Sequence, residues 1–129
     1  MIRRVESELN RALTIVITAL LVITSSFSFS QITAYATQDR SGYFNANYSL
    51  SGVPQDDIVA VARAQLGMNG TTLHYSEAWC ADFVSDCAKK AGLSYAIPAD
   101  GLCASLYSKI IANGGYEVSS PQKGDLVFY

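Results

Sequence analysis

The sequence predicts an α+β fold in which the helices come first and a strand comes last. Three segments, at residues 54–66, 79–92 and 98–112, carry apolar side chains at the spacing of a helix. The last residues, 125–129, form an apolar run of strand length. Of the 129 residues, 50% are hydrophobic and 16% are charged, a balance that excludes a disordered chain.

The charges of the chain are nearly balanced. Nine basic and eleven acidic side chains give a net charge of -2, and no basic cluster stands out. Proteins that bind nucleic acid through its phosphates need such a cluster. We therefore expect no nucleic-acid partner.

Residues 1–36 have the pattern of an export signal. Arginines at positions 3, 4 and 11 precede an apolar run, and a small-x-small site ends at Ala36. These features are typical of a secretory signal peptide. An uncleaved membrane anchor is the alternative, because the apolar stretch reaches roughly the 17 residues that can span a bilayer. We expect a secreted or cell-wall-associated protein with no stable membrane span after signal cleavage.

A linker and the first helix follow the signal. Residues 37–53 are rich in small and polar side chains without a period, which predicts a linker or a loose arm. The domain then begins near Pro54, where the following aspartates suit a helix N-terminus. Helical spacing in this first helix relates Ile58, Val61, Ala62 and Leu66, and Gly67 is its expected end.

The second helix, residues 79–92, has the most consistent pattern. Its predicted apolar face holds Cys80, Phe83, Val84, Cys87 and Ala91. Its predicted polar face holds Asp82, Ser85, Asp86, Lys89 and Lys90. The acids come early and the lysines late, an order that the helix dipole favours.

The last part of the chain predicts a third helix and then strands. Leu102, Leu106 and Ile110 share one face, and Asn113-Gly-Gly ends the helix. Residues 116–118 could form a short strand before the one at 125–129. Because a lone strand leaves its backbone groups unpaired, the sequence predicts a domain over residues 54–129 that is truncated after its first core strand.

Cys80 is the candidate nucleophile. It lies in the first turn of the second helix, where free N–H groups and the helix dipole stabilise a thiolate. A thiolate attacks a carbonyl carbon efficiently when a base stands nearby. The alternative is a buried, merely apolar cysteine, since free cysteines are among the most buried residues.

The residues around Cys80 resemble a known family. The string Trp79-Cys-Ala-Asp-Phe-Val-Ser85, with Cys87 two residues on and Ala-Gly at the helix end, is similar to the nucleophile helix of the CHAP family (cysteine, histidine-dependent amidohydrolase/peptidase). Residues 62–67 resemble that family's first helix, and residues 121–129 resemble its first core strand. The resemblance implies a papain-like α+β fold of the CHAP/NlpC type with Cys80 as catalytic nucleophile. It implies peptidoglycan as the partner, hydrolysis of its amide bonds by an amidase or endopeptidase, and no cofactor.

One part of the family pattern is missing. In the family, the base histidine and the residue that orients it follow the strand that 125–129 resembles. The single histidine here, His74, lies six residues before Cys80 in a loop. We therefore expect the 129-residue chain to be inactive in hydrolysis. The alternatives are a non-catalytic module of the same fold that binds the cell wall, and a secreted papain-like peptidase that acts on proteins.

Other candidate residues surround the second helix. Tyr75, Glu77 and Trp79 are near the nucleophile in sequence and could line a substrate cleft. Cys87 and Cys103 could form a disulfide between two helices, with two buried thiols as the alternative. A zinc site from His74 and the three cysteines is disfavoured, because their spacing lacks a close pair. We expect no metal.

Overall fold

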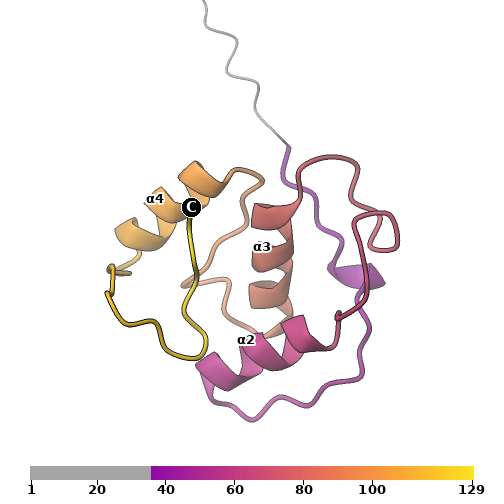
Figure 1. Ribbon diagram of the computed structural model, residues 1–129, viewed down its shortest axis with the longest axis horizontal. Coiled ribbons are helices and arrows are strands. Elements are labelled where there is room, and N and C mark those ends of the chain that lie inside the picture. The colour runs from indigo at the N-terminus through magenta and orange to yellow at the C-terminus, as the bar shows by residue number, and fades with distance from the viewer. Residues whose placement is uncertain (1–35) are drawn as a thin grey trace, which may run out of the picture. The chain divides into compact units, whose positions relative to one another are not determined.

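A computed structural model describes residues 36–129, so the predicted signal peptide lies outside the described residues except for Ala36. The described chain forms a short 3-10 helix, η1 (Ser41–Tyr43), and three α-helices, α2 (Pro54–Arg63), α3 (Cys80–Lys90) and α4 (Cys103–Ala112). Helix α3 stands in the middle and contacts the other three elements (Figure 1). Among these helices, none is both long and apolar enough to cross a membrane.

The predicted α+β, papain-like fold is wrong for the described residues, which contain three α-helices and no β-strand. Both segments expected as strands, 116–118 and 125–129, are irregular backbone. The second of them runs beside α4, where the ring of Phe128 packs edge-on against Tyr107 with centroids 5.4 Å apart. A helix offers an extended segment side-chain contacts but no row of free backbone N–H and C=O groups, so no ladder forms there.

The three predicted helices are confirmed. Helix α4 begins at Cys103 rather than near Pro98, so it is shorter than expected, and so is α2. It ends at Arg63, and Leu66, placed on its apolar face by spacing, is 80% exposed. The chain after Arg63 instead turns so that Gln65 is buried. The Gln65 side chain accepts a hydrogen bond from Asn45 N (2.8 Å) and donates to Asn45 O (2.9 Å), so the polar residue is the one that fixes the chain here.

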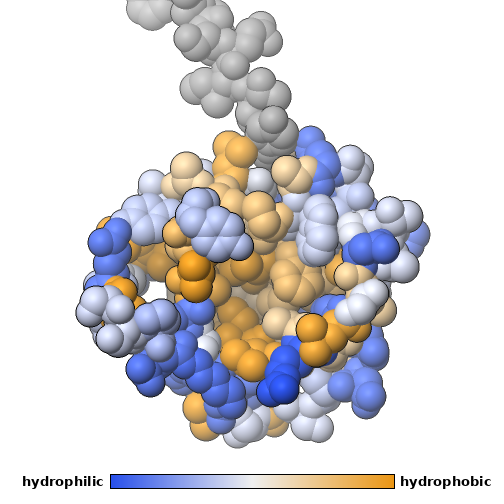
Figure 2. Space-filling model, viewed as in Figure 1, coloured by the Kyte–Doolittle hydropathy of each residue, from blue (hydrophilic) through white to orange (hydrophobic). Residues whose placement is uncertain are grey.

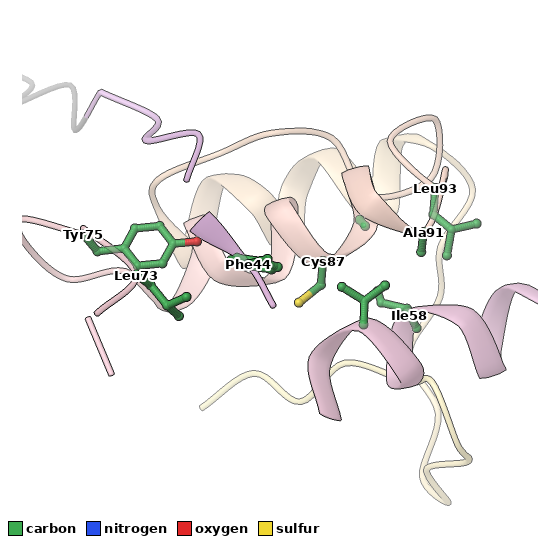
Figure 3. Close-up of a cluster of buried hydrophobic side chains, with 9 residues drawn as sticks. Phe44, Ile58, Leu73, Tyr75, Cys87, Ala91 and Leu93 are labelled. Atoms are coloured by element: carbon green, nitrogen blue, oxygen red, sulfur yellow. The ribbon is translucent and has the colours of Figure 1, made fainter. Parts of the chain in front are cut away.

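The hydrophobic core lies between α2, α3 and the segments on either side of them. Its buried members are Phe44, Ile58, Val61, Leu73, Tyr75, Cys87, Ala88, Ala91 and Leu93. Figure 3 shows Cys87 on the side of α3 that faces α2, with Phe44 beside it. All of these residues precede α4, so the core belongs to the first two thirds of the described chain.

The first part of the segment expected as a linker, residues 37–53, packs against α3 on the face that was predicted to be polar. Asp82 Oδ1 accepts the backbone N–H of Gln38 (2.8 Å), and Asp86 Oδ2 accepts that of Arg40 (2.8 Å). Both carboxylates are buried, at 1% and 3% exposure. Because the arm supplies donors to these acids, the acidic face of α3 lies inside the molecule. Burial raises the pKa of both carboxyls above its ordinary value.

A pocket of about 650 Å³ lies between α4 and the segment that follows it. Figure 2 shows apolar side chains gathered in the middle of the corresponding face. The apolar lining of the pocket includes Ile97, Tyr107, Ile110, Leu126 and Phe128. No cysteine is among the lining residues, so this pocket is separate from the candidate nucleophile.

Candidate functional site

Cys80 is the first residue of α3, and its side chain is exposed. Its two neighbours hold the backbone in place, because Ala81 is buried and Trp79 is half-buried. The N-cap residue, Trp79, makes no side-chain cap hydrogen bond, so within the described residues the first turn of α3 keeps free N–H groups that could face an anion. The structure thus selects the exposed alternative for Cys80 over the buried one.

A row of stacked aromatic rings fixes the N-terminal turn of α3. Tyr75 stacks on Trp79 with centroids 5.3 Å apart, and Trp79 meets Phe83 edge-on at 5.6 Å. Gly70 lies under the Trp79 ring, where an added Cβ would come within 2.9 Å of the indole Nε1. The tight approach at Gly70 and the stack together hold Trp79, and hence Cys80, in one position.

Cys103 is the partner of Cys80. The two Sγ atoms are 3.1 Å apart, and both thiols are exposed. Cys103 is also the first residue of its helix, α4, so the two cysteines bring two helix N-termini together. The hydrogen bond with Cys80 raises the pKa of Cys103, and the negative charge of a neighbouring thiolate acts in the same direction. Cys103 therefore keeps its proton more firmly than an ordinary cysteine.

Asp100 positions the start of α4 against α3. Its backbone N–H donates to Ser85 Oγ (3.1 Å), which anchors this loop to the middle of α3. Its carboxylate accepts hydrogen bonds from Leu102 N (2.8 Å) and Ser105 Oγ (2.5 Å) and pairs with Lys109 Nζ (2.7 Å). Burial would raise the pKa of Asp100, but these partners outweigh it, and the pKa lies below its usual value. The contact between the two sulfurs thus rests on a separate polar network.

Cys87 lies in a different environment from the other two cysteines. It is 2% exposed, and burial raises the pKa of its thiol to about 12. All three cysteines are free thiols, and Cys103 faces Cys80 rather than Cys87. Two helical turns separate Cys80 from Cys87, roughly 10 Å along the axis. The start of α4 lies at the N-terminal turn of α3, where only Cys80 is within reach.

The predicted cleft residues lie in two environments. Tyr75 is buried, and its hydroxyl donates to Asp86 Oδ2 (2.6 Å), so it belongs to the core. Burial, and then this hydrogen bond, raise the pKa of Tyr75. Glu77 is exposed and accepts a long hydrogen bond from Gln38 Nε2 (3.3 Å), while Trp79 lies beside Cys80. Glu77 and Trp79 therefore remain the candidates for a surface that receives substrate.

His74 is not assembled with the cysteines. Its ring packs against Tyr43 with centroids 4.1 Å apart, and its backbone has a positive φ of 62°. Within residues 36–129, the hydrogen-bond partner of Cys80 Sγ is Cys103 and no imidazole. The same residues gather no group of three side chains that could ligate a metal ion.

The pairing of Cys80 with Cys103 was not predicted from the sequence. The available signal was that each cysteine stands at the start of a predicted helix, because two helix starts can meet when a loop returns the chain to the same end.

Comparison with family models, curated proteins and solved structures found no match to this chain.

Proposed function

We propose that Cys80 is the nucleophile of an exported cysteine hydrolase directed at amide bonds of peptidoglycan, as an amidase or endopeptidase, and that the described residues by themselves support acylation of Cys80 rather than turnover of the amide. The observation that carries the proposal is the exposed thiol at the uncapped start of α3, within the Trp-Cys-Ala-x-Phe-Val-Ser string. The papain-like fold, overturned above, is no part of it. The export signal predicted at residues 1–36 supports an extracellular substrate.

The chemistry assigned to Cys80 is attack of its thiolate on the carbonyl carbon of the amide. A thioester to Sγ forms, the C–N bond breaks, and the amine leaves with a proton; water then hydrolyses the thioester. Expulsion of an amine needs a proton donor. Among the described residues, the group next to Cys80 is the Cys103 thiol, whose raised pKa makes it a weak acid. Cys80 should therefore acylate readily only when the leaving group needs no proton.

The test uses the purified full chain with two classes of acyl donor. A nitrophenyl ester of a peptidoglycan stem-peptide fragment should acylate Cys80, because nitrophenolate leaves without a proton. Intact mass and peptide mapping locate the acyl group. Intact peptidoglycan should release no new amino groups at a comparable rate.

Two matched controls distinguish the alternatives. Cys80→Ala should abolish acylation, and Cys87→Ala, which removes a buried thiol, should preserve it. A nitrophenyl ester of an ordinary L-peptide tests for a peptidase of proteins, and equal rates for both esters would overturn the peptidoglycan assignment. Absence of any adduct on Cys80 would leave a cell-wall-binding module as the better reading.

A further inference from the structure

We propose that Cys80 and Cys103 form a redox-active dithiol that closes to an intramolecular disulfide by exchange with a disulfide substrate. The first observation is the 3.1 Å contact between the two sulfurs. The second is that both thiols are exposed, so a disulfide in solution can reach them. This inference does not rest on the hydrolase activity, because the reaction needs only the two thiols.

The surroundings of the pair favour one direction of attack. Each sulfur belongs to the first residue of a helix, where the dipole favours an anion. Two thiolates in contact repel each other, so one of them keeps a proton. The raised pKa of Cys103 assigns that proton to Cys103, which therefore acts second in the exchange.

The exchange balances in two steps. Cys80 thiolate attacks one sulfur of the substrate R–S–S–R, forming Cys80–S–S–R and releasing R–S⁻. Cys103 then loses its proton to water and attacks the Cys80 sulfur, forming the Cys80–Cys103 bond and releasing the second R–S⁻. The protein dithiol is oxidised by two electrons, and the substrate disulfide is reduced to two thiols.

The fold keeps the pair ready for the second step. Asp100 holds the start of α4 through Ser85 on one side and Ser105 on the other. Cys103 therefore meets Cys80 without a search through loop conformations, and its attack competes well against an external thiol. Cys87, with its pKa of about 12 and 2% exposure, does not compete for the mixed disulfide.

The experiment exposes the reduced full chain to oxidised glutathione and follows intact mass. Closure predicts a loss of about 2 Da with no lasting glutathione adduct. Cys87→Ala should behave in the same way. Cys103→Ser and Cys103→Ala should instead keep glutathione on Cys80, because the second attack is gone. A glutathione adduct that persists in the wild-type chain would overturn the proposal.

Mapping the bond requires a cut between Cys80 and Cys87. Trypsin leaves both in one peptide, because no Lys or Arg lies between them. A protease that cuts before aspartate separates them at Asp82 and Asp86. The expected crosslinked peptides contain Cys80 and Cys103, and a crosslink that contains Cys87 would contradict the assignment.

Two further measurements need no variant. Phenylarsine oxide, which bridges two adjacent thiols, should protect Cys80 and Cys103 together from iodoacetamide; independent alkylation of the two would count against the pair. Closure of the loop between them should raise the Tm by roughly 10 °C, because it restricts the unfolded chain. If the Tm stayed unchanged after full oxidation, the claim that the two cysteines are already placed to form the bond would be wrong.

Discussion

The burial of side chains differs between two regions of the described chain, residues 36–97 and residues 98–129. The first region contains the hydrophobic core and the buried acids of α3, which bind the arm through backbone N–H groups. In the second region only Asp100 and Leu106 are buried, although apolar side chains are frequent there. The contrast teaches that apolar composition does not create a core by itself, because a core also needs facing elements that satisfy the backbone.

The largest expected difference between the regions comes from one substitution made in each. Val61 is fully buried in α2, and Val127 is 70% exposed near the end of the chain. Val61→Ala should lower the free energy of unfolding by about 2 to 3 kcal/mol, because it removes buried methyl groups and leaves a cavity. Val127→Ala should stay within about 0.5 kcal/mol of the wild type. Urea unfolding measures both, and equal losses would remove the distinction.

A smaller difference is expected from deleting one tyrosine hydroxyl in each region. Tyr75 donates to the buried Asp86, whereas Tyr107 donates to the exposed Glu117, both at 2.6 Å. Tyr75→Phe should cost about 1.5 kcal/mol of unfolding free energy, since a buried carboxylate loses a donor. Tyr107→Phe should have no detectable effect, because water replaces the hydroxyl. A larger loss from Tyr107→Phe in the same urea experiment would reverse the comparison.

The smallest expected effect is a pH dependence that is specific to the first region. Burial raises the folded-state pKa of Asp82, so this group contributes stability that is present below its unfolded pKa of about 3.9 and is lost as pH rises through the folded pKa. Asp82→Asn should reduce this decline with pH, and the buried Asp86, whose pKa is also raised, should keep the remainder. Unfolding free energies measured from pH 4 to 7 test it, and an unchanged slope in the variant would contradict the assignment.

Asp57 supplies the matched control for that slope. Hydrogen bonds from the backbone and hydroxyl of Ser51 hold the pKa of Asp57 below its usual value. Its contribution is therefore present above the unfolded pKa and is lost as pH falls through the folded pKa. Asp57→Asn should change the acid side of the profile below about pH 4 and leave the decline between pH 4 and 7 in place.

The helices could be predicted from the sequence, but the surfaces that they bury could not. The helical spacing in α3 identified its period correctly, and Cys87 and Ala91 are buried as expected. The burial of its polar face could not be predicted, because the donors that cover Asp82 and Asp86 are backbone groups more than forty residues away. Backbone donors leave no mark in the side-chain pattern, so an arm without apolar periodicity resembles a linker.

The strand prediction and the missed cysteine pair have related causes. An apolar run such as 125–129 indicates a strand only if a neighbouring strand exists, and the described residues offer it α4 instead. Likewise, the spacing of Cys87 and Cys103 says nothing about which end of α3 the next helix approaches. The Ser85–Asp100 contact decides that, and it depends on the path of the loop between them. Both errors concern non-local geometry.

The burial of Cys87 makes its thiol a probe of transient opening of the hydrophobic core. Its thiol reacts with a solute only after α2 and the arm have moved away from α3, since Ile58 and Phe44 lie against it (Figure 3). The rate at which a thiol reagent labels Cys87 therefore reports how often the core opens. The two exposed cysteines at the helix starts need no such opening, so their labelling rates serve as the reference. A single labelling experiment on this chain thus compares the buried thiol of Cys87 with two exposed reference thiols.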